Sequence, residues 1–167
     1  MTDAIKQEDI NAAVWAVCNT FRGTVDASIY KDYVLTMLFV KYISDVWRDH
    51  YRKYQEEYGD EPKLIQEMMK TERFNLPEGA DFYSLYDERF QPGNGERIDK
   101  ALHAIEEANI GKLRDVFQDI SFNSTRLGEE AQKNELLGRL LEDFNRAELD
   151  LRPSRVGKLD VIGNAYE

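Results

Sequence analysis

The chain has 167 residues, with 32 acidic and 22 basic side chains and a formal net charge of −10. This acidic balance disfavours a protein that binds nucleic acid by bulk electrostatics, because such binding needs many lysines and arginines on one face. The single cysteine cannot form an internal disulfide, and the sequence shows no secretory leader or membrane-spanning apolar run, so we expect one soluble, cytoplasmic domain with its own core.

The first predicted helix begins at Glu8 or Asp9 and ends at Arg22-Gly23. Its apolar residues recur at helical spacing, and glycine follows it in a usual terminating position. So short a helix needs a partner to be stable. Cys18 lies among its apolar residues, and we expect it to be a small core side chain.

A long helix at about 28–57 is the dominant predicted element. Its apolar residues fall at three- and four-residue steps from Tyr30 to Tyr54, which indicates one wide apolar stripe. Asp26 or Ser28 can cap its first turn, and neither glycine nor proline follows until Gly59. Other helices are expected to pack on this stripe.

The segments after the long helix are shorter. Pro62 suits the first turn of a brief amphipathic helix that extends to about Arg73. The aromatic segment from Asp81 to Phe90 has no clean period, so helix, strand and packed loop all remain open, and we favour a short helical piece. Gln91–Gly95 is a turn by composition. Phosphate binding by its glycines is disfavoured because no Gly-Lys-Ser/Thr follows and no buried strand precedes it.

Two more amphipathic helices are predicted in the second half of the chain. One begins at Glu96 and stops near Asn109. The other runs from Ala131 to Phe144, after a loop at 122–128 that is rich in capping residues. Residues 145–158 are polar and irregular, and we expect them to be a connector.

The last residues predict the start of another helix. Asp160 can cap its first turn, apolar residues begin a face, and the sequence stops at Glu167. Because so short a piece would not hold itself together, we expect a fragment of a longer protein. The predicted fold is all-α: a compact multi-helix domain at 1–158, built around one long central helix at about 28–57 and with long loops, then the beginning of a helix at 159–167.

Catalytic constellations are not recognisable in the sequence. His50 and His103 lie in different predicted helices, in charged neighbourhoods typical of a surface, and no residues with zinc-ligand spacing surround them. No Gly-x-Ser-x-Gly elbow is present. An aromatic stripe on the long helix is more typical of a core than of a base-stacking platform: Tyr30, Tyr33, Trp47 and Tyr51. The residues alone therefore indicate a helical domain that binds a partner, with no catalytic, cofactor-binding or metal site.

A specific pattern extends from Ala13 to Trp47. It comprises a tryptophan in a short helix, the pair Arg22-Gly23, an acidic-small turn at 26–28, and the run YKDYVLTMLFVKYISD from Tyr30 to Asp45. This pattern resembles the N-terminal domain of the modification (DNA methyltransferase) subunit of type I restriction-modification systems. Segments 117–120 and 124–128 look like the family's loop before its last helices, and 159–167 looks like its passage into the catalytic domain.

The resemblance implies that the full-length protein is a site-specific adenine-N6 DNA methyltransferase that uses S-adenosylmethionine. It would work with a specificity subunit and, for restriction, a restriction subunit on double-stranded DNA. In that family a glycine-containing loop holds the cofactor and an Asn-Pro-Pro-Phe/Tyr motif holds the flipped adenine. Neither occurs in this segment, so the resemblance implies that it has no cofactor and is inactive alone.

A non-catalytic role follows for this segment, in which a helical domain helps to close the enzyme around DNA and contacts the specificity subunit. A few phosphate contacts suffice for that role, since they position a duplex without reading it. The candidate phosphate contacts are Arg22, Lys31, Lys41, Arg126 and Lys133. Composition alone also supports an alternative, a self-contained acidic interaction module such as an adaptor or an antitoxin-like protein.

Overall fold

A computed structural model describes residues 7–21, 27–59, 61–71, 75–77, 79–113, 117, 120–145, 149 and 151, and over these ranges the backbone forms helices and no strand. The helices are α1 (Gln7–Phe21), α2 (Ala27–Tyr58), α3 (Pro62–Met69), α4 (Phe82–Asp87), α5 (Asn94–Ala108), α6 (Ile110–Leu113) and α7 (Glu130–Phe144), with a 3-10 turn η1 (Thr125–Leu127). The predicted all-α class is confirmed.

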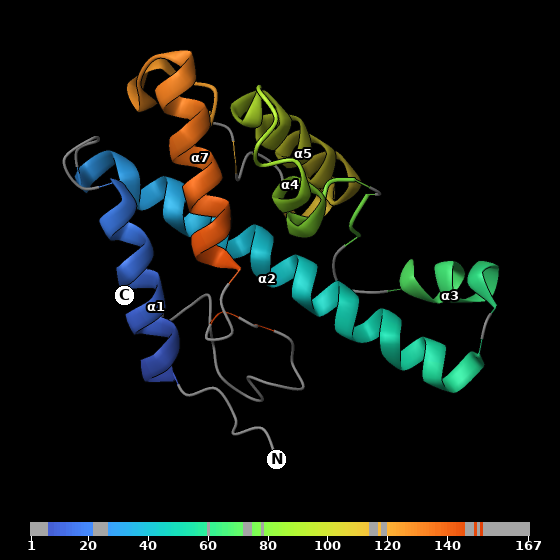
Figure 1. Ribbon diagram of the computed structural model, residues 1–167. Helices are drawn as coiled ribbons and strands as arrows, with labels where there is room; N and C mark the ends of the chain where they lie inside the picture. Colours follow the sequence, from blue (N-terminus) through green and yellow to red (C-terminus); the bar gives the residue numbers. More distant parts are fainter. Residues whose placement is uncertain are drawn as a thin grey trace.

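Helix α2 is the longest element and runs diagonally through the molecule (Figure 1). It has 32 residues, close to the predicted span of about 28–57. Its first half is deeply buried: Tyr33, Val34, Met37, Leu38 and Val40 are each 4% exposed or less. The last α2 residue in the main hydrophobic core is Ile43. The predicted stripe therefore serves the core only along the first half of the helix.

The main core lies where α1, α4, α5 and α7 gather around that half of α2 (Figure 1). Helix α7 packs against α1, α4 and α5, and its buried apolar residues are Leu136, Leu137, Leu140, Leu141 and Phe144. Each such side chain contributes about 1.5–3 kcal/mol when fully buried. Because helices of this length are marginal in isolation, this shared core is what stabilises them.

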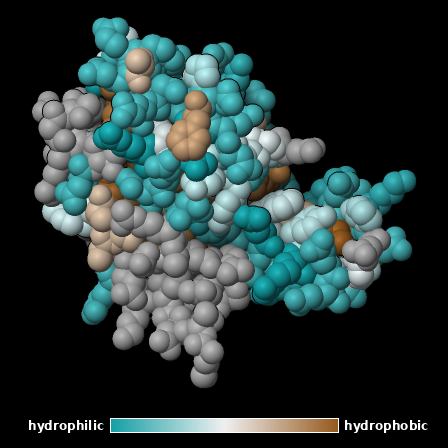
Figure 2. Space-filling model, viewed as in Figure 1, coloured by the Kyte–Doolittle hydropathy of each residue, from teal (hydrophilic) through white to brown (hydrophobic). Residues whose placement is uncertain are grey.

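Helix α3 lies apart from the main core. Its extensive contacts are with α2, against which it buries Ile65 and Met69. Pro62 occupies the start of α3, as predicted. We call α3 and residues 47–58 of α2 the side arm. Figure 2 shows the side arm projecting from a body whose visible face is mostly hydrophilic, with a hydrophobic area near the junction.

The structure settles the aromatic segment at Asp81–Phe90, for which helix, strand and loop were open. Residues Phe82–Asp87 form α4, and the Asp81 carboxylate caps it by accepting hydrogen bonds from the backbone N–H of Tyr83 at 3.1 Å and of Ser84 at 3.2 Å. The favoured helical prediction is therefore confirmed. An aspartate at this position is what lets so short a helix begin.

Some predicted boundaries differ from the observed ones. Helix α5 begins at Asn94, inside the predicted turn at Gln91–Gly95, because Gly93 takes a left-handed backbone (φ 85°) that closes the turn before it. Helix α3 ends at Met69, short of Arg73. The predicted cap at Asp26, most of the connector at 145–158 and the helix start at 159–167 lie outside the described residues.

Gly95 is fixed by packing. A Cβ atom at this position would lie 2.6 Å from the backbone O of Phe122 and 2.9 Å from Cα of Asn123, both rigid backbone atoms. One turn later, Asp99 accepts hydrogen bonds from the backbone N–H of Phe122 and the hydroxyl of Ser121, each at 2.7 Å. The first turn of α5 thus lies against the loop that precedes η1. This close contact leaves no room for a side chain at position 95, which accounts for the glycine.

We predict that Gly95→Ala lowers the free energy of unfolding by about 1–3 kcal/mol, because the methyl group forces the loop away from α5. The matched control is Gly111→Ala, where an added Cβ meets no atom within 4 Å. That substitution should change stability by less than about 1 kcal/mol, in either direction. Urea denaturation measures both, and equal effects would contradict the packing account.

Candidate functional site: a groove beside a buried ion pair

The predicted phosphate contacts fall in different environments. Lys31 is exposed near the start of α2, and Arg126 is exposed in η1. Lys133 is 5% exposed, and its ammonium donates to the carbonyl of Asn123 at 3.2 Å and pairs with Glu130 at 2.8 Å. Arg22 lies outside the described residues. The structure therefore leaves two of the described candidates accessible, Lys31 and Arg126.

Lys41 requires a correction, because it is 2% exposed and cannot present its charge to a phosphate at the surface. Its ammonium contacts the Asp45 carboxylate at 2.5 Å, the backbone carbonyl of Leu149 at 2.8 Å and the hydroxyl of Tyr83 at 3.2 Å. The physical reason is that Lys41 lies on the buried side of α2. An ammonium held there must be paired internally.

Asp45 is the other half of this buried pair and is 1% exposed. Besides Lys41, it accepts hydrogen bonds from the backbone N–H of Leu151 at 2.8 Å and from the Tyr83 hydroxyl. Burial, and then the negative charge of Asp45, raise the pKa of Tyr83 above its ordinary value, so the phenol stays protonated and donates. The pair thereby ties α2 to α4 and to the segment that follows α7.

Arg126 is carried on a loop that other residues hold in place. The Tyr33 hydroxyl donates to the backbone carbonyl of Ser121 at 2.9 Å, and the Ser124 hydroxyl accepts from the backbone N–H of Arg126 at 3.2 Å. Burial raises the pKa of Tyr33, and nearby Ser124 and the Arg126 charge partly oppose this. Lys133 supports the same loop through Asn123. This arrangement presents one exposed guanidinium from a fixed backbone.

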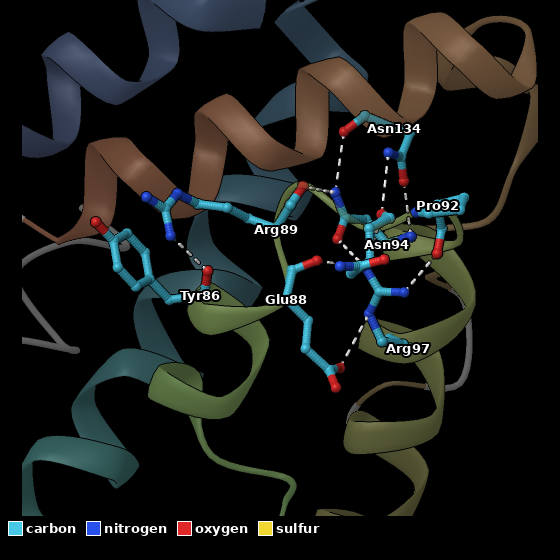
Figure 3. Close-up of polar contacts among 8 residues, drawn as sticks. Tyr86, Glu88, Arg89, Pro92, Asn94, Arg97 and Asn134 are labelled. Carbon is cyan, nitrogen blue, oxygen red and sulfur yellow. Dashed lines mark hydrogen bonds and ion pairs between the residues drawn. The ribbon is translucent and has the colours of Figure 1, made fainter.

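The turn between α4 and α5 is held by a dense set of polar contacts (Figure 3). The Arg97 guanidinium donates to the backbone carbonyls of Pro92 at 2.5 Å, Glu88 at 2.8 Å and Gln91 at 3.0 Å. Its Nε lies 3.3 Å from the Glu88 carboxylate. Arg97 thus holds three backbone carbonyls of the α4–α5 turn and fixes how α4 leads into α5.

Asn94 and Asn134 join that turn to α7 (Figure 3). The Asn94 side-chain amide donates to the carbonyls of Arg89 at 2.8 Å and Asn134 at 3.0 Å, and the Asn134 side chain accepts from the Asn94 backbone N–H at 2.8 Å. Side chains of both α5 and α7 therefore hold the α4–α5 turn, and with it the end of α4, in place. The consequence for the site is a fixed position for Tyr83, which α4 carries.

A groove opens where the side arm meets the body. Its larger hollow has a volume of about 850 Å³ and is lined mainly by residues of α2, of α3 and of the ranges 75–77 and 79–87. A neighbouring hollow of about 500 Å³ shares some of its lining. The residues that line both are Trp47, Arg48, Tyr51 and Tyr83. We refer to the two hollows together as the groove.

Aromatic rings and a guanidinium form the shared wall of the groove. The rings of Trp47 and Tyr51 stack with centroids 5.0 Å apart and planes 20° apart. The Arg48 guanidinium lies 4.0 Å from the centroid of the Tyr83 ring, a cation–π arrangement. These aromatic rings and the guanidinium line the hollow, so the wall suits a ligand with flat or apolar groups.

The prediction that the aromatic stripe of the long helix belongs to the core is correct for only part of that stripe. Tyr33 is buried, as expected, and Tyr30 packs partly buried against the core. Trp47 and Tyr51 are half-buried and line the groove instead. The sequence carried a weak signal for this, since the apolar stripe narrows after Trp47 while arginines appear at 48 and 52. The opposing wall comes from residues far along the chain, which no local pattern could place.

The remaining candidates from the sequence have ordinary environments. Cys18 is partly buried against the core, as predicted, and His103 is exposed. Within the described ranges, no group of at least three His, Cys, Asp or Glu side chains is placed to hold a metal ion. None of the described helices is long and apolar enough to cross a membrane.

Comparison with known proteins places residues 10–144 in the family model described as the HsdM N-terminal domain. The chain is 24% identical over 151 residues to the type I restriction enzyme MpnII methylase subunit of Mycoplasma pneumoniae, and the match covers 87% of this chain and 27% of that protein. It is 23% identical over 164 residues to the MjaIX methylase subunit of Methanocaldococcus jannaschii, covering 78% of this chain and 29% of that protein.

A solved structure has the same fold. It is the type I restriction-modification system methyltransferase subunit from Streptococcus thermophilus, with a TM-score of 0.74 and 22% sequence identity. The match covers 96% of this chain and 37% of that one. The chain thus spans 27% and 29% of the length of the two curated relatives.

We predict that Lys41→Met lowers the free energy of unfolding by about 3–5 kcal/mol, because it leaves the buried Asp45 carboxylate without its cation. Lys100→Met is the matched control, since Lys100 and Glu96 form an exposed pair at the same four-residue spacing. Loss of such a surface pair costs about 0–1 kcal/mol. Urea denaturation distinguishes the two, and a tolerated Lys41→Met would show that the buried pair is dispensable.

Proposed function

The chain belongs to the HsdM N-terminal domain family, and we propose that it is the non-catalytic helical domain of a type I restriction-modification adenine-N6 DNA methyltransferase subunit. The observation that carries this proposal is the family match over residues 10–144. The shared fold with a methyltransferase subunit supports it. Because the chain spans under a third of its curated relatives, the activity of the whole protein is part of the proposal.

In the proposed full-length enzyme, the chemistry lies outside this chain. The sequence has neither a glycine-containing cofactor loop nor an Asn-Pro-Pro-Phe/Tyr motif to hold a flipped adenine. S-adenosylmethionine would bind the catalytic domain, and this domain would need no cofactor of its own. The cytoplasm is the proposed location, where the enzyme meets double-stranded DNA.

The proposed contribution of this domain to DNA binding is a small number of phosphate contacts. Lys31 and Arg126 are our candidates among the described residues, because both are exposed and both sit on fixed elements. Arg22 stays a candidate from the sequence. Lys133 acts through the loop that carries Arg126. Because a net charge of −10 disfavours a large DNA footprint, we propose only a few phosphate contacts, which position a duplex that another subunit reads.

Contacts with the specificity subunit, and with the restriction subunit when it joins, complete the proposal. The described surface offers exposed apolar side chains for such contacts: Trp15 at 62%, Phe90 at 76% and Ile110 at 56% exposure. Aromatic residues of this kind are enriched at protein interfaces. They lie on α1, on the α4–α5 turn and on α6.

We predict that this chain alone neither binds S-adenosylmethionine nor methylates DNA, because the cofactor loop and the adenine-binding motif are absent. Transfer of a labelled methyl group to DNA should appear only with the protein that includes the catalytic domain, assembled with its specificity subunit. Saturable heat of S-adenosylmethionine binding to this chain alone would overturn the assignment of a non-catalytic role.

We predict that Lys31→Ala and Arg126→Ala each weaken DNA binding by the assembled full-length enzyme on all sequences alike. Each lost phosphate contact should lower the slope of log affinity against log salt by about 1. Arg139→Ala is the control, since Arg139 is an exposed arginine on α7 paired with Glu135. Titrations at several salt concentrations measure the slopes. Unchanged slopes for the first two variants, or an equal change for the third, would remove these contacts from the proposal.

A further inference from the structure

The chain that follows α7 meets the buried ion pair at two backbone positions, Leu149 and Leu151. We propose that Lys41 and Asp45 act together as a backbone anchor, which sets the direction in which the chain leaves this domain toward the rest of the full-length protein. The inference goes beyond the proposed DNA and subunit contacts. It rests on the proposed function only in taking this chain as one domain of a longer protein.

The backbone anchor binds one acceptor and one donor of the main chain. The Lys41 ammonium donates to the carbonyl of Leu149, and the Asp45 carboxylate accepts from the N–H of Leu151, each at 2.8 Å. Both charged groups can reach the same short segment because side chains four residues apart lie on one face of a helix. Hydrogen bonds to charged groups are roughly twice as strong as those between neutral groups. The anchor is therefore a specific site for this segment.

The two leucines also bring their side chains into the main core. Leu149 and Leu151 are both 0% exposed and belong to the main hydrophobic cluster. Their backbone contacts with α2 join positions that are 108 and 106 residues apart in the sequence. The segment is thus held in two ways, by burial of its side chains and by pairing of its backbone with α2.

Stability alone does not account for an ion pair at this place. Apolar side chains of similar volume often replace a buried ion pair with little loss of stability, or with a gain. Such side chains on α2 would, however, leave the Leu149 carbonyl and the Leu151 N–H buried without these partners, which costs free energy. What the charged pair adds is recognition of the backbone, and that recognition fixes the path of the chain.

Tyr83 holds the backbone anchor from the α4 side. Its hydroxyl accepts from the Lys41 ammonium at 3.2 Å and donates to the Asp45 carboxylate. Helix α4 is in turn fixed through the α4–α5 turn by Arg97 and Asn94 (Figure 3). The charged side chains therefore have little freedom to follow a moving segment, so the body of the domain determines where the chain leaves it.

The first test is amide hydrogen exchange in the unmodified chain, followed by NMR. Because the Leu151 N–H is buried and bound to Asp45, it should exchange at least about 100-fold more slowly than in an unstructured peptide. Faster exchange would show that the segment is not held, and it would overturn the proposal without the use of any variant.

A triple variant then removes the polar groups while keeping the apolar volume: Lys41→Met, Asp45→Leu and Tyr83→Phe. It should unfold at a urea midpoint within about 0.5 M of the unmodified chain, because no charge is left unpaired. The Leu151 N–H should nevertheless exchange at least about tenfold faster, and the Leu140 N–H of α7 should change by less than about threefold. A folded triple variant that still protects Leu151 would contradict the proposal.

Two controls separate the anchor from its surroundings. Tyr83→Phe alone keeps the ion pair and should leave Leu151 exchange within about threefold of the unmodified chain. The double variant Glu96→Leu and Lys100→Met removes an exposed pair of the same spacing, and it should also leave Leu151 unchanged. Release of Leu151 by the second control would show that the effect is not specific to the buried pair.

Small-angle X-ray scattering of the full-length protein tests the direction of the chain. The triple variant should have a larger radius of gyration than the unmodified protein, because this domain is no longer held at a fixed angle to the rest. Tyr83→Phe alone should leave the scattering curve unchanged. An unchanged curve for the triple variant would overturn the claim that the anchor sets the direction. None of these measurements depends on methyl transfer, so a wrong methyltransferase assignment and a wrong anchor give different results.

Discussion

The buried pair of Lys41 and Asp45 joins three parts of the domain: α2, α4 and the residues that follow α7. Both side chains are removed from water, at 2% and 1% exposure, so each polar atom must find a partner inside the protein. The partners come from α4, through Tyr83, and from the backbone at Leu149 and Leu151. Desolvation offsets much of the attraction in such a pair, so its main effect is to specify which segments meet.

That constraint divides α2 into two functional halves. Before the pair, the helix contributes residues such as Met37 and Leu38 to the main core, and α1, α4, α5 and α7 gather there. Beyond it, α2 leaves the body together with α3, and its aromatic and basic side chains line the groove. One uninterrupted helix thus joins the main core of the domain to the side arm (Figure 1).

The fold was largely predictable because local periodicity determines it. The stripe on α2 and the apolar faces of α5 and α7 can be read from spacing, and Asp81 marks the start of α4 once the helix is known. Lys41 and Asp45 also fall on the buried stripe, four residues apart, which was the available signal for an internal pair. The prediction that Lys41 is a surface cation did not take its place on this buried stripe into account. The groove could not be predicted from the sequence, because its walls come together only where α2 meets residues 75–87 in the tertiary structure.

We propose that this helical domain touches DNA within a larger methyltransferase. Site-specific photo-crosslinking tests it most directly, with a benzoylphenylalanine placed at position 126 or, as the control, at position 139 on α7. The assembled full-length enzyme, with its specificity subunit, would be irradiated on DNA that carries its recognition sequence. We predict a crosslink to DNA from position 126 and none from position 139. A complex that methylates its DNA yet gives no crosslink from position 126 would contradict it.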